Sequence, residues 1–387
     1  MTSGMNEIAF VTANRSKHAE VQRLLAGVKL RWERLDLARP ATDDLAAIAR
    51  PRVTEAYRRL GVPCFLENTG LWLWEHGGAP GASFKKTWRE LGEAGFAARY
   101  GGAHGMARVV VAYAASESDV RTFEGHVAGT LLREPRGEPG FGWDRLWVPD
   151  GYDRTLGELR GSTYVVNMRA APYLELGELL RGHVAPSVFE AHVTVAPCEL
   201  APFRAACAEL GVKSISIELP VGETKTQPMT GSFHRGEMLD VQREVMELAR
   251  ELVRRGFDVT RVKIEAHGKL AFAPETDEAA RAAPATSYFE YHLKLALGPE
   301  VDVAALGERL RRVGAHLSRN AHKAPDERGT SERFVTLRAH GVGRNTAEER
   351  FAAIVALVES EGLVIRNRIR EYTVFDTNVA LDRGWIE

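Results

Sequence analysis

Residues 8–17 read IAFVTANRSK, an apolar run followed by a polar turn that ends in a lysine. The residues after the turn place Val21, Leu24 and Leu25 on one face of a helix. This stretch therefore predicts a strand, a loop and a helix in that order. Similar apolar runs alternate with helical or turn-rich stretches at residues 62–66, 107–114 and 146–148. Such alternation is typical of an α/β sheet domain.

The length and composition predict a soluble protein of more than one domain. The chain has 387 residues, of which 44% are hydrophobic and 27% are charged. At about 150 residues per domain, this length favours two or three domains, and we expect two. The formal net charge of -1 gives no reason to expect a nucleic acid or a membrane surface as a partner. Any phosphate-binding site must therefore be local.

The cysteines and the first residues indicate a reducing compartment. Cys64, Cys198 and Cys207 form no CxxC pair, and an odd, sparse set argues against a disulfide scaffold or a structural zinc site. The first residues lack the basic start and long apolar core of a secretory signal. No stretch approaches the ~18 apolar residues that a membrane span needs. We therefore expect a cytoplasmic protein.

The second part of the chain contains an internal repeat. The residues FEAH at 189–192 recur as FEYH at 289–292, and TGSFH at 230–234 recurs as TLRAH at 336–340. A third echo matches VTRVKI at 259–264 with VIRNRI at 364–369. The echoes keep their order, which predicts a duplicated unit of roughly 80 to 95 residues.

The element order of each repeat predicts a ferredoxin-like α+β unit. Helical patterns occur at Pro202–Leu210, Glu237–Arg255, Val303–Val313 and Thr346–Glu361. They give each repeat the order β-α-β-β-α-β, and such units join edge to edge or face to face around a pseudo-twofold axis. We expect a first domain over residues 1–182, a boundary at residues 181–187, and a second domain over 188–387 with repeats at about 188–270 and 287–376.

Three segments of the first domain point to a nucleotide-binding cleft. The turn at residues 12–17 opens a helix, so free backbone N–H groups, the helix dipole and Lys17 favour phosphate there. The segment CFLENTGL at 64–71 reads as a strand ending in Glu67 and Asn68, where a carboxylate could hold magnesium. The segment GFGWD at 140–144 offers aromatic faces for a base and, in Asp144, an acceptor for a purine N–H.

Together these segments resemble the inosine triphosphate pyrophosphatase family, in order, over about residues 6–180. Besides the three segments, the matches are Gly78-x-Pro80-Gly81, Pro149-Asp150-Gly151-Tyr152-x-x-Thr155-x-x-Glu158 and Met168-Arg169-Ala170 before a helix with Leu174-Glu175-Leu176. The resemblance implies a two-lobed α/β fold with a long mixed sheet, a cleft between the lobes, and a homodimer. It also implies magnesium-dependent cleavage of inosine, xanthosine and related triphosphates to the monophosphate and pyrophosphate.

The resemblance also implies roles for individual residues. Thr12, Asn14 and Lys17 would hold the triphosphate, and Glu20 would support their turn. Glu67 would help to bind magnesium and, with Lys17 and the residue at position 68, would form the catalytic group. Phe141, Trp143 and Asp144 would stack on the base and read it. Arg169 would contact the 6-oxo edge of the base.

Several catalytic positions depart from the family pattern. Asn68 replaces the second carboxylate of an acidic pair, and an amide can neither take a proton nor hold an ion with full charge. The expected metal-binding glutamate falls on Ala47, with Asp43 and Asp44 one turn away. Its companion lysine falls on Arg52, a later lysine on Thr163, and Ser-His-Arg reads Asn167-Met168-Arg169. Two main descriptions fit: a pyrophosphatase with an altered catalytic shell, or a purine-nucleotide-binding sensor that is coupled to the second domain.

The second domain carries histidines at repeated positions. Glu190 with His192, and Glu290 with His292, lie two apart on predicted strands, so each pair projects from one face. A twofold axis could bring these pairs, with His234 and His340, into a shared cleft that binds a metal or performs acid/base chemistry.

Two readings of this domain stay open, a binding scaffold and a second catalytic site. Residues 192–194 read His-Val-Thr and are similar to the His-x-Thr motif of two-histidine phosphoesterases, but residues 292–294 read His-Leu-Lys. The basic residues of the third echo are interpreted as a solvated face. They are Arg261, Lys263, Arg366 and Arg368.

Overall fold

The chain divides into two compact units, Asn6–Gly182 and His183–Glu387. The computed structural model describes residues 7–181, 187–219, 223–267, 272–320, 325–327 and 329–384. Most of the predicted boundary, residues 182–186, lies outside these ranges, as do residues 268–270 at the predicted end of the first repeat. None of the helices in the described ranges combines the length and the apolar character that a membrane span needs.

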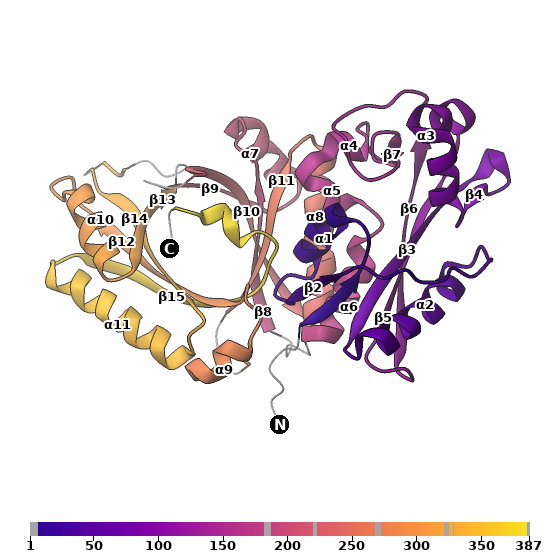
Figure 1. Cartoon of the computed structure of the whole chain (residues 1–387). Coiled ribbons are helices and arrows are strands. Elements are labelled where there is room, and N and C mark those ends of the chain that lie inside the picture. The colour runs from indigo at the N-terminus through magenta and orange to yellow at the C-terminus, as the bar shows by residue number, and fades with distance from the viewer. Residues whose placement is uncertain are drawn as a thin grey trace. The chain divides into compact units, whose positions relative to one another are not determined.

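The amino-terminal unit is built on a seven-stranded mixed sheet, as the fold class predicted (Figure 1). The strand order is β2-β1-β3-β5-β6-β7, and β4 pairs with β3. β1 is parallel to β2 and β3, whereas the other pairs are antiparallel. The strands are β1 (Ile8–Val11), β2 (Leu30–Glu33), β3 (Cys64–Leu73), β4 (Pro80–Gly81), β5 (His104–Ala114), β6 (Val120–Leu131) and β7 (Trp147–Pro149).

Helices connect these strands, and α2 illustrates how the sequence defines one of them. The helices are α1 (Arg15–Leu24), α2 (Leu45–Leu60), α3 (Phe84–Tyr100), α4 (Leu156–Leu159), α5 (Thr163–Val166) and α6 (Ala170–Arg181), with short 3-10 turns η1 (Trp74–His76) and η2 (Arg160–Ser162). The Asp44 side chain caps α2 by accepting from the backbone N–H of Ala46 at 2.8 Å. Gly61, with φ of 66°, ends it in the left-handed region. Its buried face includes Ile48 and Val53, which pack in the same core as β3 and β5.

The register of β1 against β3 determines what the first loop meets. Only Ala9 and Phe10 pair with β3, opposite Cys64 and Phe65, and the two phenylalanine rings stack at 4.6 Å. β3 does not end in Glu67 and Asn68, as the sequence suggested, because it pairs with β5 along its whole length to Leu73. Glu67 therefore lies within a strand, but just past the end of the shorter β1, beside the turn that follows β1.

The carboxyl-terminal unit is a closed eight-stranded barrel with the order β10-β8-β11-β15-β12-β14-β13-β9. Its first repeat comprises β8 (Ser187–Val195), α7 (Leu200–Glu209), β9 (Lys213–Glu218), β10 (Thr226–Gly236), α8 (Met238–Arg254) and β11 (Val259–His267). The second comprises β12 (Tyr288–Leu297), α10 (Val303–Arg312), β13 (Ala315–Asn320), β14 (Ser331–His340), α11 (Arg344–Ser360) and β15 (Val364–Asp376). The short helices α9 (Asp277–Ala282) and η3 (Val379–Asp382) lie outside this pattern.

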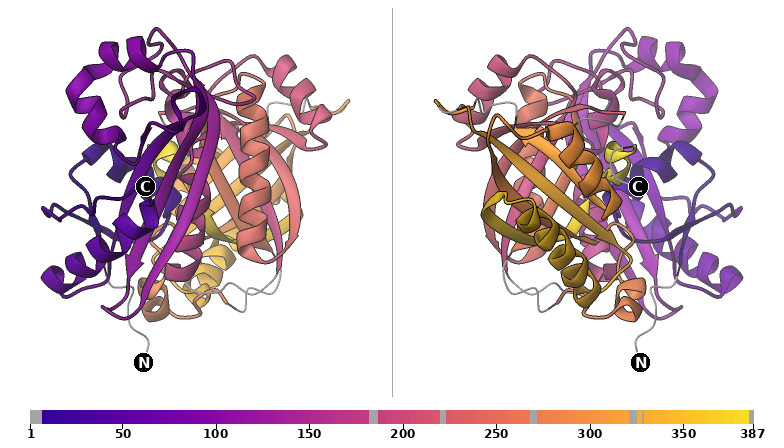
Figure 2. Two further views of the ribbon diagram at one scale, coloured as in Figure 1. Left: turned by 90° about the vertical axis from the view of Figure 1, so that its right-hand side faces the viewer. Right: turned by 90° about the vertical axis from the view of Figure 1, so that its left-hand side faces the viewer.

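The repeats join edge to edge, through β11 with β15 and through β9 with β13. Within each repeat the first strand lies between the third and the fourth. We interpret each repeat as ferredoxin-like on this order of elements. Figure 2 shows α8 and α11 against the outer face of the barrel, in its left and right views respectively. The inner face is thus lined mainly by side chains of the strands, with Asp382 of η3 among them.

The ladders correct two of the three sequence echoes by one residue. Opposite β8, Lys263 pairs with His192, whereas Ile369 of β15 pairs with His292 in the second repeat. Lys263 therefore corresponds to Ile369 and not to Arg368. In the same way His234 pairs with Phe189, but His340 pairs with Tyr288, one residue before the equivalent Phe289. A one-residue slip moves a side chain to the opposite face of a strand.

We expect Phe65→Ala to destabilise the amino-terminal unit by about 3–5 kcal/mol, because the ring is fully buried and stacks on Phe10. Urea unfolding followed by tryptophan fluorescence measures this, since every tryptophan except Trp385 lies in this unit. The control Phe65→Leu keeps most of the volume and costs less than about 1.5 kcal/mol. Equal losses in the two variants would contradict the stacking argument.

Candidate functional site

Lys17 and Glu67 meet at the junction of β1 and β3. Lys17 lies in the first turn of α1, and its Nζ is 2.6 Å from Oε1 of Glu67. Both side chains are shielded from solvent, with Glu67 only 2% exposed. The sequence predicted both residues for the cleft, and the short β1 brings them together.

The Glu67 carboxylate accepts from donors on α6 and beside it as well. Arg169 donates from Nε at 3.0 Å and from Nη2 at 3.0 Å, and the Tyr173 hydroxyl donates at 2.9 Å. Although burial alone would raise the pKa of Glu67, Arg169 and Lys17 hold it well below its usual range. Burial lowers the pKa of Lys17 despite the attraction of Glu67. The predicted magnesium ligand is therefore engaged on both oxygens, and a metal ion there would have to displace a cation.

Glu20 supports Arg169 from the other side. Nη1 of Arg169 lies 3.3 Å from Oε2 of Glu20, while the Asn167 amide donates to Oε1 of Glu20. Asn167 also accepts from the backbone N–H of Arg169 at 2.8 Å. Two carboxylates and two cations thus form a cluster without net charge, which comprises Lys17, Glu20, Glu67 and Arg169. Glu20 thus lies in α1, after the predicted phosphate turn, and forms an ion pair with Arg169.

Phe141 covers this cluster. Its ring centroid is 4.3 Å from Nζ of Lys17 and 5.3 Å from the guanidinium carbon of Arg169. Asp144 accepts from the backbone N–H of Phe141 at 2.6 Å, and burial raises its pKa to about 6. The aromatic loop and the phosphate turn therefore face one another, as the nucleotide hypothesis requires.

Trp143 does not face the cluster. It is 1% exposed and packs edge-on against Phe84, with ring centroids 4.3 Å apart. The structure therefore leaves no face of Trp143 open to a base. The turn itself is ordered by Thr12, whose hydroxyl accepts from the backbone N–H of Asn14 at 3.1 Å and whose carbonyl accepts from Trp32 at 2.8 Å.

Asn68 is held by arginines instead of presenting a free amide. Its Oδ1 accepts from Arg52 at 2.5 Å and from Arg39 at 3.5 Å. Its Nδ2 is buried without a hydrogen-bond partner among the described residues. The position that would hold a catalytic carboxylate thus lies against positive charge.

A basic pocket of about 670 Å³ adjoins Asn68 and was not predicted from the sequence. Its charged lining residues are Arg39, Asp43, Lys85, Lys86 and Arg89. Lys85 is close enough to Glu67 for that carboxylate to raise its pKa, although burial and the nearby arginines lower it overall. The feature that could have predicted this pocket is the presence of Lys85 and Lys86 in the first turn of a helix, because such a turn favours binding of anions.

The other departures from the family pattern leave no carboxylate in their place. Ala47 is exposed on α2, and Asp44 is used as the cap of that helix. Asp43 accepts from the backbone N–H of Ala82 at 3.3 Å and lines the basic pocket. Thr163 donates to the carbonyl of Leu156, whereas Met168 is buried.

The carboxyl-terminal unit contains a cavity of about 810 Å³ inside the barrel. His192, His234 and His292 line it, so three of the four predicted histidines converge there. His340 does not line it, because the one-residue offset places its ring against Tyr288 at 4.3 Å. His234 is bonded to Ser232 and to Glu244 of α8.

The sequence predicted only some of the charged side chains that lie inside the barrel. Arg261 and Lys263 line the cavity and are buried, which contradicts the solvated face proposed for them. Arg366 and Arg368 are exposed, as that interpretation required, because Asn367 and Ile369 take the inner positions. Residues that the sequence analysis missed are Glu265, His267, Arg338, Glu371 and Asp382.

The family match lies in the amino-terminal unit. The Ham1 family matches residues 8–164. The chain is 34% identical over 163 residues to inosine triphosphate pyrophosphatase 2 of Trypanosoma cruzi (strain CL Brener), covering 41% of this chain and 83% of that protein. It is 32% identical over 158 residues to a dITP/XTP pyrophosphatase of Methanopyrus kandleri, covering 40% and 84%. A HAM1 protein structure from Coxiella burnetii aligns at 23% identity and a TM-score of 0.38, covering 46% of this chain and 98% of that one.

We expect Glu67→Gln to lower the free energy of unfolding of this unit by about 3–5 kcal/mol, because it leaves Lys17 and Arg169 short of a buried counter-charge. The matched control is Glu93→Gln, which breaks a 3.0 Å pair with Arg145 at 30% exposure and costs about 0–1 kcal/mol. Urea unfolding of the two variants measures the difference. A Glu67→Gln loss no larger than the control would show that the cluster is not a stabilising centre.

Proposed function

This chain belongs to the Ham1 family, and we propose that its amino-terminal unit hydrolyses a purine nucleoside triphosphate of the inosine or xanthosine type to the monophosphate and pyrophosphate. The observation that carries the proposal is the convergence of Lys17, Glu67, Arg169, Phe141 and Asp144 beside a basic pocket. The relatives named above for such activities supply the substrate class.

The groups around Phe141 suit an oxopurine. A base stacked on this ring would displace Lys17 from it, and a phosphate would give the displaced ammonium a new partner. Asp144 in its ionised form would accept from the N–H of the six-membered ring, and Arg169 would donate to the 6-oxo group. Adenine presents neither of these groups in that form, so the site would favour inosine over adenosine triphosphate.

The basic pocket would receive the phosphates. Arg39, Lys85, Lys86 and Arg89 surround a space that includes the first turn of α3. Cations and helix N–H groups stabilise the charge that develops when a phosphoanhydride bond breaks. Since the whole chain is nearly neutral, this local excess of positive charge is what attracts the triphosphate.

The residues present do not fit a magnesium ion held by the protein. Glu67 is saturated by donors, Asn68 faces two arginines, and Asp43 is the single carboxylate among the charged residues of the pocket. Mg²⁺ prefers a nearly ideal shell of oxygen ligands, usually with one or two carboxylates. We therefore assign neutralisation of the phosphates to the arginines and lysines of this chain.

A second candidate function is nucleotide binding without hydrolysis. It is favoured by Asn68, because the amide and its arginine partners leave no general base at the position where the family carries a carboxylate. Tight binding of the ground state does not by itself lower the barrier to reaction. Such a module would sense a purine triphosphate and pass that signal to the rest of the chain.

Pyrophosphate release from inosine triphosphate separates the two functions. We expect the full chain, supplied with the triphosphate and Mg²⁺ in the buffer, to release pyrophosphate slowly but measurably, and adenosine triphosphate to react more slowly still. Lys17→Ala lowers the rate by about 10²–10³-fold, since it removes one preorganised cation. The control Lys29→Ala removes an exposed lysine of the same unit and leaves the rate unchanged. If the chain binds the triphosphate but releases no more pyrophosphate than Lys17→Ala does, the sensor function is favoured.

Asn68→Asp restores the carboxylate and tests whether its absence is the cause. This variant should raise pyrophosphate release about tenfold or more.

Nucleotide affinity should depend on the ionisation of Asp144. Burial raises the pKa of this carboxyl to about 6, so it is ionised above that pH and protonated below it. Only the ionised form accepts on both oxygens, so the dissociation constant for inosine triphosphate should rise as the pH falls from 8 to 5. Calorimetric titration of wild type and Asp144→Asn isolates this effect, because the γ-phosphate titrates equally in both. Asp153→Asn, an exposed control, keeps the wild-type profile; a wild-type profile in Asp144→Asn would refute the assignment.

A further inference from the structure

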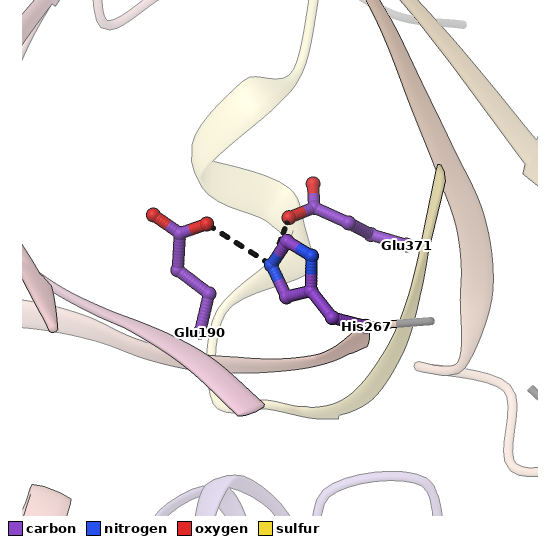
Figure 3. Close-up of side chains that lie close together, drawn as sticks. All are labelled: Glu190, His267 and Glu371. Carbon is purple, nitrogen blue, oxygen red and sulfur yellow. Dashed lines mark hydrogen bonds and ion pairs between the residues drawn. The ribbon is translucent and has the colours of Figure 1, made fainter. Parts of the chain in front are cut away.

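The barrel of the carboxyl-terminal unit holds a continuous row of imidazoles and carboxylates. Nε2 of His267 lies 3.1 Å from Oε2 of Glu190 and 2.6 Å from Oε1 of Glu371 (Figure 3). The second oxygens of these carboxylates face further imidazoles, with Oε1 of Glu190 3.8 Å from Nε2 of His192 and Oε2 of Glu371 3.3 Å from Nε2 of His292. Three Nε2 atoms and two carboxylates thus alternate in one row, and all of these residues except His267 line the cavity.

The pseudo-twofold arrangement of the barrel repeats this carboxylate pair. The ladders place Glu190 opposite Glu265, and Glu290 opposite Glu371. The pair Glu190 and Glu371, with His267, is here called the His267 half. The related pair is Glu290 and Glu265, here called the Lys263 half. The two halves are therefore related positions with different occupants.

A cation already occupies the Lys263 half. The ammonium of Lys263 lies 2.9 Å from Glu265 and 3.0 Å from Glu290. Arg338, which pairs with Glu290 across the ladder, adds a second cation. Two buried carboxylates are thus held together by positive charge between them.

The His267 half has the same carboxylates but lacks both of these cations. Ile369 occupies the position that corresponds to Lys263, and Phe233 lies opposite Glu190 where Arg338 lies opposite Glu290. The residue that corresponds to His267 in the second repeat is Thr373, which donates to Glu265 at 3.3 Å. The carboxylates of the Lys263 half are therefore paired with a lysine and an arginine, whereas those of the His267 half contact an imidazole.

Two of the three imidazoles, those of His192 and His292, are oriented as metal ligands are. Nδ1 of His192 donates to the carbonyl of Thr230 at 2.9 Å, which leaves its Nε2 lone pair directed at Glu190 and Glu265. Nδ1 of His292 is bonded to the Thr336 hydroxyl at 2.9 Å. A hydrogen bond at the far nitrogen is the usual support for a ligating histidine.

We propose that Glu190, His267 and Glu371 bind one divalent transition-metal ion of the Zn²⁺ or Co²⁺ type, with His192 and His292 as further ligands. The three donor atoms lie within 4.8 Å of one another, and bonds of about 2.0–2.2 Å to a common ion need only small side-chain shifts. A mixed set of imidazole and carboxylate favours first-row transition metals over Mg²⁺ or Ca²⁺. Nε2 of His267 now contacts both carboxylates, as the Lys263 ammonium does in the related half, so the ion would enter between this nitrogen and the two carboxylates.

The site opens onto the 810 Å³ cavity. Glu190, His192, His292 and Glu371 all line that cavity, so the ion would lie on its wall. The site lies wholly in the carboxyl-terminal unit and uses none of the residues proposed for nucleotide hydrolysis. The proposal therefore stands or falls independently of that function.

Titration with Co²⁺ tests the proposal directly. The full chain, without a histidine tag, is treated with EDTA and titrated with CoCl₂, while visible absorption and calorimetry are recorded. We expect one Co²⁺ per chain with ligand-field bands distinct from those of the aquated ion. His267→Gln and Glu371→Gln should weaken binding by more than about 100-fold, because loss of a direct ligand exceeds the 10–100-fold cost of losing an outer partner. The control His234→Gln alters a histidine of the same cavity that is bonded to Ser232 and Glu244, and should leave the affinity unchanged.

A second variant tests the comparison of the two halves with every ligand retained. Ile369→Lys introduces the counterpart of Lys263, whose ammonium should enter between Glu190 and Glu371 and reduce Co²⁺ affinity by about 100-fold or more. Circular dichroism and the thermal midpoint report whether the barrel stays folded. The proposal is overturned if wild type shows only the aquated-ion spectrum, or if His267→Gln and Ile369→Lys, both folded, bind Co²⁺ as wild type does.

Discussion

The structure of the amino-terminal unit depends on the ion pairs of one buried carboxylate, that of Glu67. It joins β3 to the start of α1 through Lys17 and to the segment entering α6 through Arg169. With Glu20 on the far side of Arg169, the cluster contains two positive and two negative charges. Taking four charges out of water costs several kcal/mol per ion, and only close hydrogen-bonded contacts offset that cost. The cluster therefore holds three elements in register before any ligand binds, and its net charge is zero.

Most of the charge for a triphosphate would consequently come from the adjoining pocket, with Lys17 as one further cation. Arg39, Lys85, Lys86 and Arg89 supply it, and Arg52 extends it to Asn68. Replacing a carboxylate by an amide next to arginines converts a place that would attract a cation into one that attracts an anion. On the function proposed above, this change would strengthen binding of the phosphates in the ground state and would leave no carboxylate at this position to activate water. Recognition of the nucleotide would then be retained better than the rate of hydrolysis.

The sequence predicted local features of this site well and long-range ones poorly. The turn after β1 and the aromatic loop follow from neighbouring residues, and so do the amphipathic helices of the repeats. The engagement of Glu67 does not, because it depends on how early β1 ends and on Arg169, which lies over a hundred residues away. Burial of Trp143 depends on Phe84 in the same way. In the barrel, a one-residue error in aligning the repeats was enough to exchange inner and outer faces, since side chains alternate along a strand.

A duplicated barrel within one chain can do what a symmetric dimer cannot, because its two halves vary separately. In a homodimer every substitution appears twice, so a lysine that neutralised one carboxylate pair would neutralise both. Here Lys263 lies in one half and Ile369 at the equivalent position of the other, and His267 in one repeat corresponds to Thr373 in the other. The Lys263 half gains a fixed internal cation that stabilises the barrel without any ligand. The His267 half has no lysine or arginine at the equivalent positions, so its carboxylates can bind an exchangeable cation instead.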